Sequence, residues 1–205
     1  MTDLGIIQRR LRGYWFVDGF QEIAGGTALA IAGALAVAGS ITGNDSLSAA
    51  GVYALALAAL PAAVAIRVAK RQVTYVRTGW VRESKTASLV RLAVAIVWTI
   101  IATPLLVAYL RGGALNTGWA LAAMGIAIGV GAGSQAWLTG TRRFYVQAIV
   151  FPLAGLATAL AGLDFRTGFA TMILTGGVSL LATGAFALRK YLRANPAADI
   201  EAVAP

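Results

Sequence analysis

Long apolar stretches alternate with short polar segments along this chain. Because a bilayer core of about 30 Å requires roughly 20 apolar residues per helix, each long stretch is a candidate membrane span. Six stretches qualify, at residues 23–41, 47–66, 87–110, 118–138, 145–163 and 168–188. The pattern predicts an all-α integral membrane bundle of six transmembrane helices over residues 22–190.

The two ends of the chain differ from this pattern. Within residues 1–21 the apolar side chains recur at helical spacing, with Arg9 and Arg12 on the opposite face. This predicts an amphipathic helix lying in the membrane interface. "QRRLRGYW" before an apolar run also matches a twin-arginine signal peptide, but five further spans favour the bundle. Residues 191–205 are expected to form a flexible tail.

Composition supports the membrane assignment and narrows the chemistry. The chain has 205 residues, of which 59% are hydrophobic and 12% charged, and its mean hydropathy is +0.75. It has no cysteine and no histidine, which excludes disulfides, thiolate nucleophiles, imidazole bases and the common zinc sites. We therefore expect no enzyme, no cofactor and no metal site, although Asp18, Glu22 and Asp164 remain candidate acids for an intramembrane enzyme.

The positive charges predict orientation. The formal net charge is +9, and most lysines and arginines lie in the N-terminal segment, in the loop 67–86, near residue 142 and at the C-terminal end. On the other side of the predicted bundle lie only Arg111 and Arg166. By the positive-inside rule both termini face the cytoplasm, in a bacterial cytoplasmic membrane. Anionic lipids of the cytoplasmic leaflet, rather than nucleic acid, are the expected counter-charge.

The segment "RQVTYVRTGWVRES", residues 71–84, is the least apolar part of the chain. Valine, threonine and aromatic residues around a glycine favour a small β-hairpin, and a coil is the alternative. Its basic and aromatic side chains are suited to contact lipid headgroups or a partner protein. We predict such contacts for Arg71, Tyr75, Arg77, Trp80 and Arg82. The alternative is an ordinary loop that only sets topology.

Charged residues inside the predicted spans predict an ion pair. Asp18 and Glu22 are four residues apart and share one helical face, and Arg91 is expected at a similar depth in the third span. A charge at this depth needs a partner or must reach the interface. We predict a structural ion pair between Arg91 and one of the two carboxylates. An ion entry site is the alternative.

Glycines and buried polar residues predict helix contacts. Gly125, Gly129 and Gly133 recur every four residues, which permits close helix packing; a pore lining or an oligomer interface is the alternative. Proline inside a span, as at Pro61, predicts a kink. Polar side chains in the spans are expected to line a small polar cavity, with Gln135, Gln147 and Thr175 as its candidates.

Three segments carry a resemblance to a known group. "YWFVDGFQEIAGG", "VTYVRTGWV", and "RRFYVQAIVFPLAGLATALAGL" followed by "RKYLR" resemble a family of uncharacterised bacterial polytopic membrane proteins with six spans. In that family proline usually precedes the Arg-Thr-Gly sequence, where this chain has Val76. The resemblance implies the architecture and no activity.

Two functions fit these expectations. The first is a non-catalytic membrane component that binds lipid or a partner protein through its basic cytoplasmic face, with a homo-oligomer as a further possible assembly. The second is a small-solute transporter, channel or substrate-binding transport subunit. In size and topology alone the chain is similar to the substrate-capture subunits of energy-coupling-factor vitamin importers.

Overall fold

The computed structural model describes residues 16–78 and 118–196, and every regular element in these ranges is a helix. The elements are α2 (Phe20–Thr42), α3 (Asp45–Ala69), the π-helix η2 (Lys70–Thr74), α4 (Tyr75–Thr78), α6 (Gly118–Thr139), α7 (Phe144–Leu160) and α8 (Phe165–Ala194). The predicted all-α class is therefore confirmed. The predicted third span and most of the predicted N-terminal helix lie outside the described residues.

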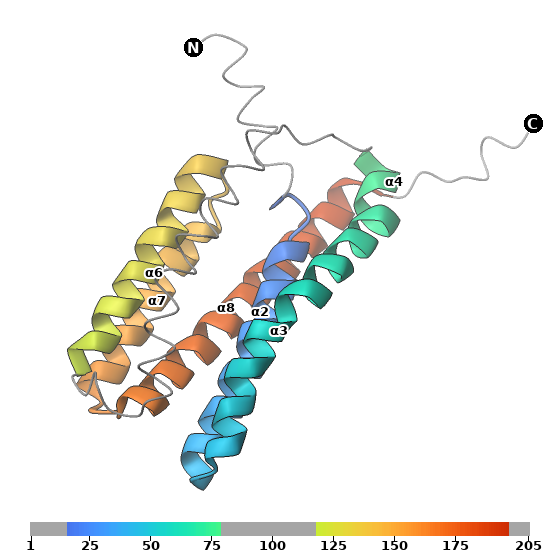
Figure 1. Ribbon diagram of the computed structural model, residues 1–205. Helices are drawn as coiled ribbons and strands as arrows, with labels where there is room; N and C mark the ends of the chain where they lie inside the picture. Colours follow the sequence, from blue (N-terminus) through green and yellow to red (C-terminus); the bar gives the residue numbers. More distant parts are fainter. Residues whose placement is uncertain (1–15, 79–117, 197–205) are drawn as a thin grey trace, which may run out of the picture.

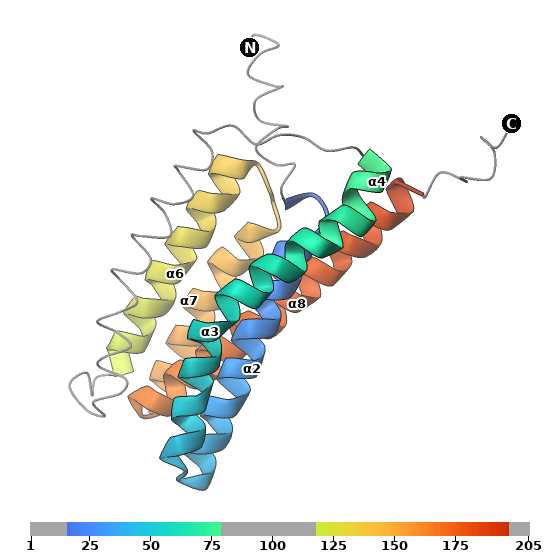
Figure 2. The same ribbon diagram turned by 45° about the vertical axis from the view of Figure 1, so that its right-hand side comes forward.

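The helices form two neighbouring groups. α2 packs against both α3 and α8, and α6 packs against α7 as a hairpin. α7 also contacts α8 and so joins the groups, as Figures 1 and 2 show from two directions. A small core of Met124, Phe151 and Met172 lies where α6, α7 and α8 meet. Each of these side chains is less than 8% exposed.

Close contact between α2 and α8 depends on glycines. A Cβ atom added at Gly26 would lie 2.6 Å from the Leu181 amide nitrogen, and one at Gly33 would lie 2.7 Å from Leu174 Cα. On α8, a Cβ atom at Gly177 would overlap the backbone of Ala30. Close backbone contact through small residues is typical of helices that pack in membranes.

Three described helices are long and apolar enough to cross a membrane: α2, α6 over Trp119–Thr139, and α8. A fourth candidate is α3 with its extension, whose parts Asp45–Ala58 and Leu60–Thr78 are bent by 48°. α7 has 17 residues, fewer than the roughly 20 that a straight span needs. The described residues thus hold three or four candidate spans, and the total of six stays a prediction.

A proline accompanies the bend in this fourth candidate. Pro61 lies inside α3, close to the break between Ala58 and Leu60. Its ring clashes with the carbonyl four residues earlier and it has no amide hydrogen, which is an established cause of helix kinks. The π-helix η2 lies farther along, within the second part of the candidate.

The predicted hairpin at 71–84 is wrong over residues 71–78, which continue α3 as a helix. The reason is tertiary: the helical register buries Lys70 and Thr74, and both side chains bond to Asp18 in the turn before α2. Packing of this kind overrides the strand preference of valine, threonine and tyrosine. At the other end of the chain, α8 continues through Ala194, beyond the expected boundary at 190.

Short turns join the helices at the end of the bundle away from α4 (Figure 1). Asn44 caps α3 by accepting a hydrogen bond from the Leu47 amide at 3.1 Å. Asp164 caps α8 by accepting hydrogen bonds from the amides of Arg166 and Thr167. Arg166 also reaches Asp45 at the start of α3, at 2.8 Å.

Candidate functional site

The described positive charges gather at one end of the bundle. α2 begins at this end, α4 and α8 finish there, and the turn from α6 to α7 lies there too (Figure 1). Within residues 16–78 and 118–196, every lysine and arginine except Arg166 lies at or near this end. The set, which we call the basic end, comprises Arg67, Lys70, Arg71, Arg77, Arg142, Arg143, Arg189, Lys190 and Arg193.

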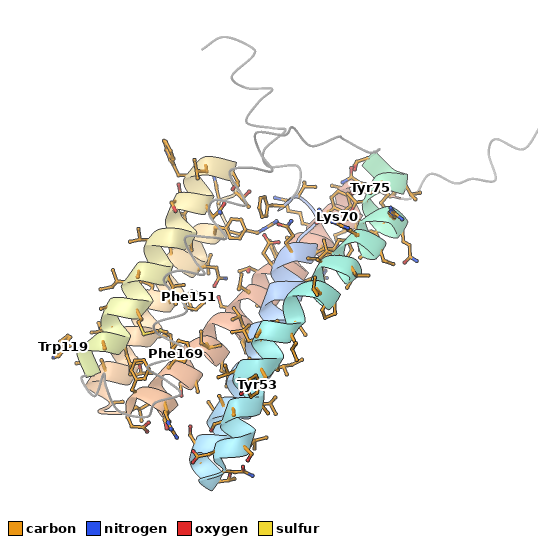
Figure 3. All side chains as sticks on the ribbon, viewed as in Figure 1. Tyr53, Lys70, Tyr75, Trp119, Phe151 and Phe169 are labelled. Atoms are coloured by element: carbon orange, nitrogen blue, oxygen red, sulfur yellow. The ribbon has the colours of Figure 1, made fainter. Side chains whose placement is uncertain are left out.

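A buried ion pair links the turn before α2 to η2 at the basic end. Lys70 Nζ lies 2.8 Å from Asp18 Oδ2, and the two side chains are 2% and 0% exposed. The Thr74 hydroxyl donates to the same carboxylate oxygen at 2.8 Å, while Asp18 Oδ1 accepts from the Phe20 amide. Figure 3 shows Lys70 on the same segment as Tyr75. Both carboxylate oxygens are therefore hydrogen-bonded, and the geometry of this pair fits a structural role.

Tyr191 fastens the end of α8 to the same segment. Its hydroxyl donates to the Thr74 carbonyl at 3.3 Å and lies 3.0 Å from the Thr78 hydroxyl. The Tyr191 side chain is buried. Polar contacts therefore join the turn before α2, the segment η2–α4 and the end of α8.

A second ion pair joins α2 to α7. Arg143 Nε donates to Glu22 Oε1 at 2.6 Å, and the Glu22 side chain is 2% exposed. Glu22 lies in the first turn of α2, where the helix dipole favours a negative charge. The other carboxylate oxygen, Oε2, and the guanidinium nitrogen Nη2 are both buried, and neither has a hydrogen-bond partner among the described residues.

Gln147 lies one turn further along and extends these contacts. We call the set Glu22, Arg143, Gln147, Ser179 and Thr183 the polar layer. The amide nitrogen of Gln147 donates to Ser179 Oγ at 3.1 Å and to Thr183 Oγ1 at 3.3 Å, both on α8. Its amide oxygen is buried and has no partner in the described part of the chain. Gln147 is 2% exposed, so its contacts lie inside the bundle.

Two glycines bring these groups together. Gly19, just before α2, has a φ of 77°, a left-handed conformation that favours glycine, and a Cβ atom there would overlap the Gly184 carbonyl oxygen. A Cβ atom at Gly184 would lie 3.0 Å from Glu22 Cβ. The close approach of α2 and α8 therefore places Glu22 beside the segment of α8 that holds Gln147.

The two predicted carboxylates are ion-paired, but with cations that the sequence interpretation did not select. Asp18 pairs with Lys70 and Glu22 with Arg143, while Arg91, the predicted partner, lies outside the described residues. A signal for the observed partners was present. Lys70, Thr74 and Thr78 recur every four residues, as do Arg143 and Gln147, and that spacing marks one face of a helix.

Part of the predicted glycine row on α6, at Gly125 and Gly129, faces α7. A Cβ atom at Gly125 would overlap the Phe151 carbonyl oxygen, and one at Gly129 would lie 2.5 Å from the ring of Pro152. Gly133 has more room, 3.6 Å from Ala148 Cβ. Two of the three positions therefore lie against α7 at distances that admit only glycine.

The predicted contact residues of the basic end have mixed exposure. Arg71 is exposed, whereas Tyr75 and Arg77 are partly buried. Arg77 donates to the carbonyl oxygen of Val73 at 3.0 Å. Trp80 and Arg82 lie outside the described residues.

The three polar-cavity candidates lie in different surroundings. Gln147 is buried and bonded to α8, as described above. Thr175 is exposed and its hydroxyl donates to the Thr171 carbonyl of its own helix. Gln135 is partly buried on α6. Of the three candidates, only Gln147 therefore belongs to the buried polar layer.

Further chemistry is limited in the described part of the chain. No group of three or more Asp or Glu side chains there is arranged to hold a metal ion. Neither the comparison with protein-family models nor the searches of curated proteins and solved structures finds a match to this chain.

Proposed function

We propose that this protein is a multi-pass component of a bacterial cytoplasmic membrane, with its basic end and both termini on the cytoplasmic side. The support is the distribution of charge. The described cations concentrate at one end of apolar helices, which is the arrangement that the positive-inside rule associates with the cytoplasm. Trp119 and Trp137, at opposite ends of α6, are 70% and 75% exposed, as expected for aromatic residues in the two interfaces.

We infer that the protein has a non-catalytic role and binds anionic lipid headgroups through the basic end. The observation that carries this proposal is a lack of compensating charge at the surface. Among the described residues, the only acids at this end are Asp18 and Glu22, and both are buried in ion pairs. Arg71, Arg142 and Lys190 are exposed at the same end.

The end of α8 is the strongest candidate for this contact. Arg189, Lys190 and Arg193 are all exposed and lie in the last turns of the helix, where the helix dipole favours positive charge. Each basic residue near an anionic membrane surface contributes about 1 kcal/mol of attraction. Because about 1.4 kcal/mol corresponds to a tenfold change in affinity, the three charges account for a factor of roughly one hundred.

Native mass spectrometry of the detergent-extracted protein, titrated with phosphatidylglycerol and phosphatidylcholine, tests this role. The variant R189Q/K190Q/R193Q should lose most of its preference for phosphatidylglycerol, by one to two orders of magnitude in apparent affinity. R166Q is the control, because it removes an arginine from the opposite end. Equal phosphatidylglycerol binding by the wild type and the triple variant would contradict the proposal. A co-purifying polypeptide, or a second copy of the chain, released by the same variant would instead identify a protein partner.

A second candidate, a small-solute transporter or substrate-binding transport subunit, is favoured by one observation. The buried oxygens Glu22 Oε2 and Gln147 Oε1 lack hydrogen-bond partners in the described residues, as groups that face a polar ligand do. A transporter of this type should retain a small-molecule adduct from cell extract in native mass spectra. Retention of the same adduct by Q147M would argue against this site as its location.

A further inference from the structure

The ion pair between Glu22 and Arg143 is only half formed. An arginine and a carboxylate usually make two parallel hydrogen bonds, with two guanidinium nitrogens facing two carboxylate oxygens. Here only Nε and Oε1 are bonded, at 2.6 Å. The donor Nη2 and the acceptor Oε2 are left without partners among the described residues, although both atoms are buried.

Gln147 supplies a third buried atom without a partner in the described part of the chain. It follows Arg143 by four residues, and Arg143 caps α7 with helical backbone angles, so the two side chains lie on one face. Thr183 Oγ1 donates its proton to the Ser179 carbonyl at 3.0 Å, so it can only accept from Gln147. The amide nitrogen therefore faces α8, and the amide oxygen is directed elsewhere.

A buried polar atom without a partner costs about 1–3 kcal/mol, and a native protein usually avoids this cost. Two such atoms belong to the bonded pair Glu22 and Arg143, and the third belongs to Gln147, four residues after Arg143, which indicates that another molecule completes their hydrogen bonds. The set consists of one donor, Arg143 Nη2, and two acceptors, Glu22 Oε2 and Gln147 Oε1. An oxygen that accepts one hydrogen bond and donates one or two has the complementary chemistry.

The charge of the site limits the ligand further. Glu22 and Arg143 compensate each other, and the nearby cation Lys70 is paired with Asp18. An ion with net charge would be buried here without a counter-charge, which is strongly unfavourable. The site therefore selects an uncharged molecule.

We propose that this layer between α2, α7 and α8 binds the hydroxyl oxygen of a small uncharged molecule, either water or a polyol of the size of glycerol. The oxygen accepts from Arg143 Nη2 and donates to Glu22 Oε2. Gln147 Oε1 accepts the second hydrogen of water, or a second hydroxyl of a polyol. This proposal rests on the interior of the bundle and does not depend on lipid binding at the basic end.

Crystal structures grown in lipidic mesophase, with and without glycerol in the soak, test the proposal and separate its two sources. We expect a density peak within hydrogen-bond distance of Arg143 Nη2 and Glu22 Oε2. A single-oxygen peak that glycerol leaves unchanged identifies water, and a peak that extends into a polyol in the glycerol soak identifies the solute. A closed two-bond pair between Arg143 and Glu22, or an open pair without any peak, overturns the proposal.

Two methionine variants test the contribution of Gln147. Q147M removes the third hydrogen-bonding atom while approximately keeping side-chain length, and should lower the occupancy of the peak at least severalfold. Q135M is the matched control, because Gln135 is a partly buried residue on α6 and its replacement should leave the peak unchanged. Full occupancy in Q147M would refute the three-point site.

Discussion

Alanine at Gly26 would place a methyl group against the backbone of α8, and the neighbouring position provides a control. A Cβ atom at Gly26 would lie 2.6 Å from the Leu181 nitrogen, 2.9 Å from the Gly177 carbonyl oxygen and 3.0 Å from Leu180 Cβ. Two of these three atoms belong to the backbone, so the helices themselves must separate. At Gly25 an added Cβ atom meets nothing within 4 Å.

The expected magnitudes follow from two opposing effects. Replacing glycine by alanine inside a helix stabilises it by up to about 1 kcal/mol, and this gain applies equally to both positions. Overpacking costs about 1–3 kcal/mol and applies only to Gly26. We therefore expect G25A to be neutral or slightly stabilising, and G26A to have a free energy of unfolding about 1–3 kcal/mol below that of G25A.

Reversible unfolding in mixed micelles, followed by far-ultraviolet circular dichroism as the denaturing detergent is titrated, measures this difference. The comparison is sharp because the two residues are adjacent, so effects on the unfolded chain cancel. Identical unfolding midpoints for G25A and G26A would show that α2 and α8 do not pack through Gly26, and the close contact between these helices would have to be abandoned.

Three further substitutions test the polar contacts and a helix cap. Lys70→Met leaves the Asp18 carboxylate buried without its cation, and should lower the free energy of unfolding by about 3–5 kcal/mol. Adding Asp18→Asn should recover part of this loss of stability. Additive losses of stability in the double variant would argue against direct pairing of Lys70 and Asp18. Tyr191→Phe removes two hydrogen bonds to the segment after α3 and should lower the free energy of unfolding by about 1–2 kcal/mol in the same titration. Amide hydrogens near Thr74 should also exchange faster. Unchanged amide exchange near Thr74 would contradict the contact. Partial burial acts to raise the pKa of Asp164, but hydrogen bonds from the residues after it outweigh this effect and hold the pKa below its usual 3.8. The ionised cap therefore stabilises the fold at neutral pH and loses this effect as the pH falls through the lowered pKa. Asp164→Ala should lower the free energy of unfolding by about 1 kcal/mol at pH 7 and progressively less in acid. A difference in stability between wild type and variant that does not depend on pH would refute the capping role.

The hydropathy pattern predicted the helices well because burial in lipid demands long apolar helices. The predicted stretches at 23–41, 118–138 and 168–188 lie within α2, α6 and α8, apart from small differences at their ends. Side-chain spacing was less informative at the start of the first span: Asp18 and Glu22 were expected on one face of a single helix, but α2 begins at Phe20, and Asp18 precedes it with Gly19 in a left-handed conformation between them.

Local preference failed where another helix decided the conformation. Residues 71–78 have strand-forming side chains, yet they are helical because Lys70 and Thr74 bond to Asp18, in the turn before α2. The strand preference of valine, threonine and tyrosine is weak enough to be overridden when a helix buries a charged side chain beside its counter-ion. No pattern within the segment records which distant residue it will meet.

The sequence by itself determined the helical membrane class, the asymmetry of charge and the absence of thiol and imidazole chemistry, because these follow from composition and period alone. Only the tertiary structure decided which glycines contact which helix, that Lys70 and Arg143 pair with the two carboxylates, that Tyr191 joins α8 to the segment after α3, and that Gln147 joins α7 to α8. The physical reason is that the spacing of apolar residues along the chain specifies which face of a helix is polar. Which residues pair across helices depends instead on how helices distant in the chain rotate and cross.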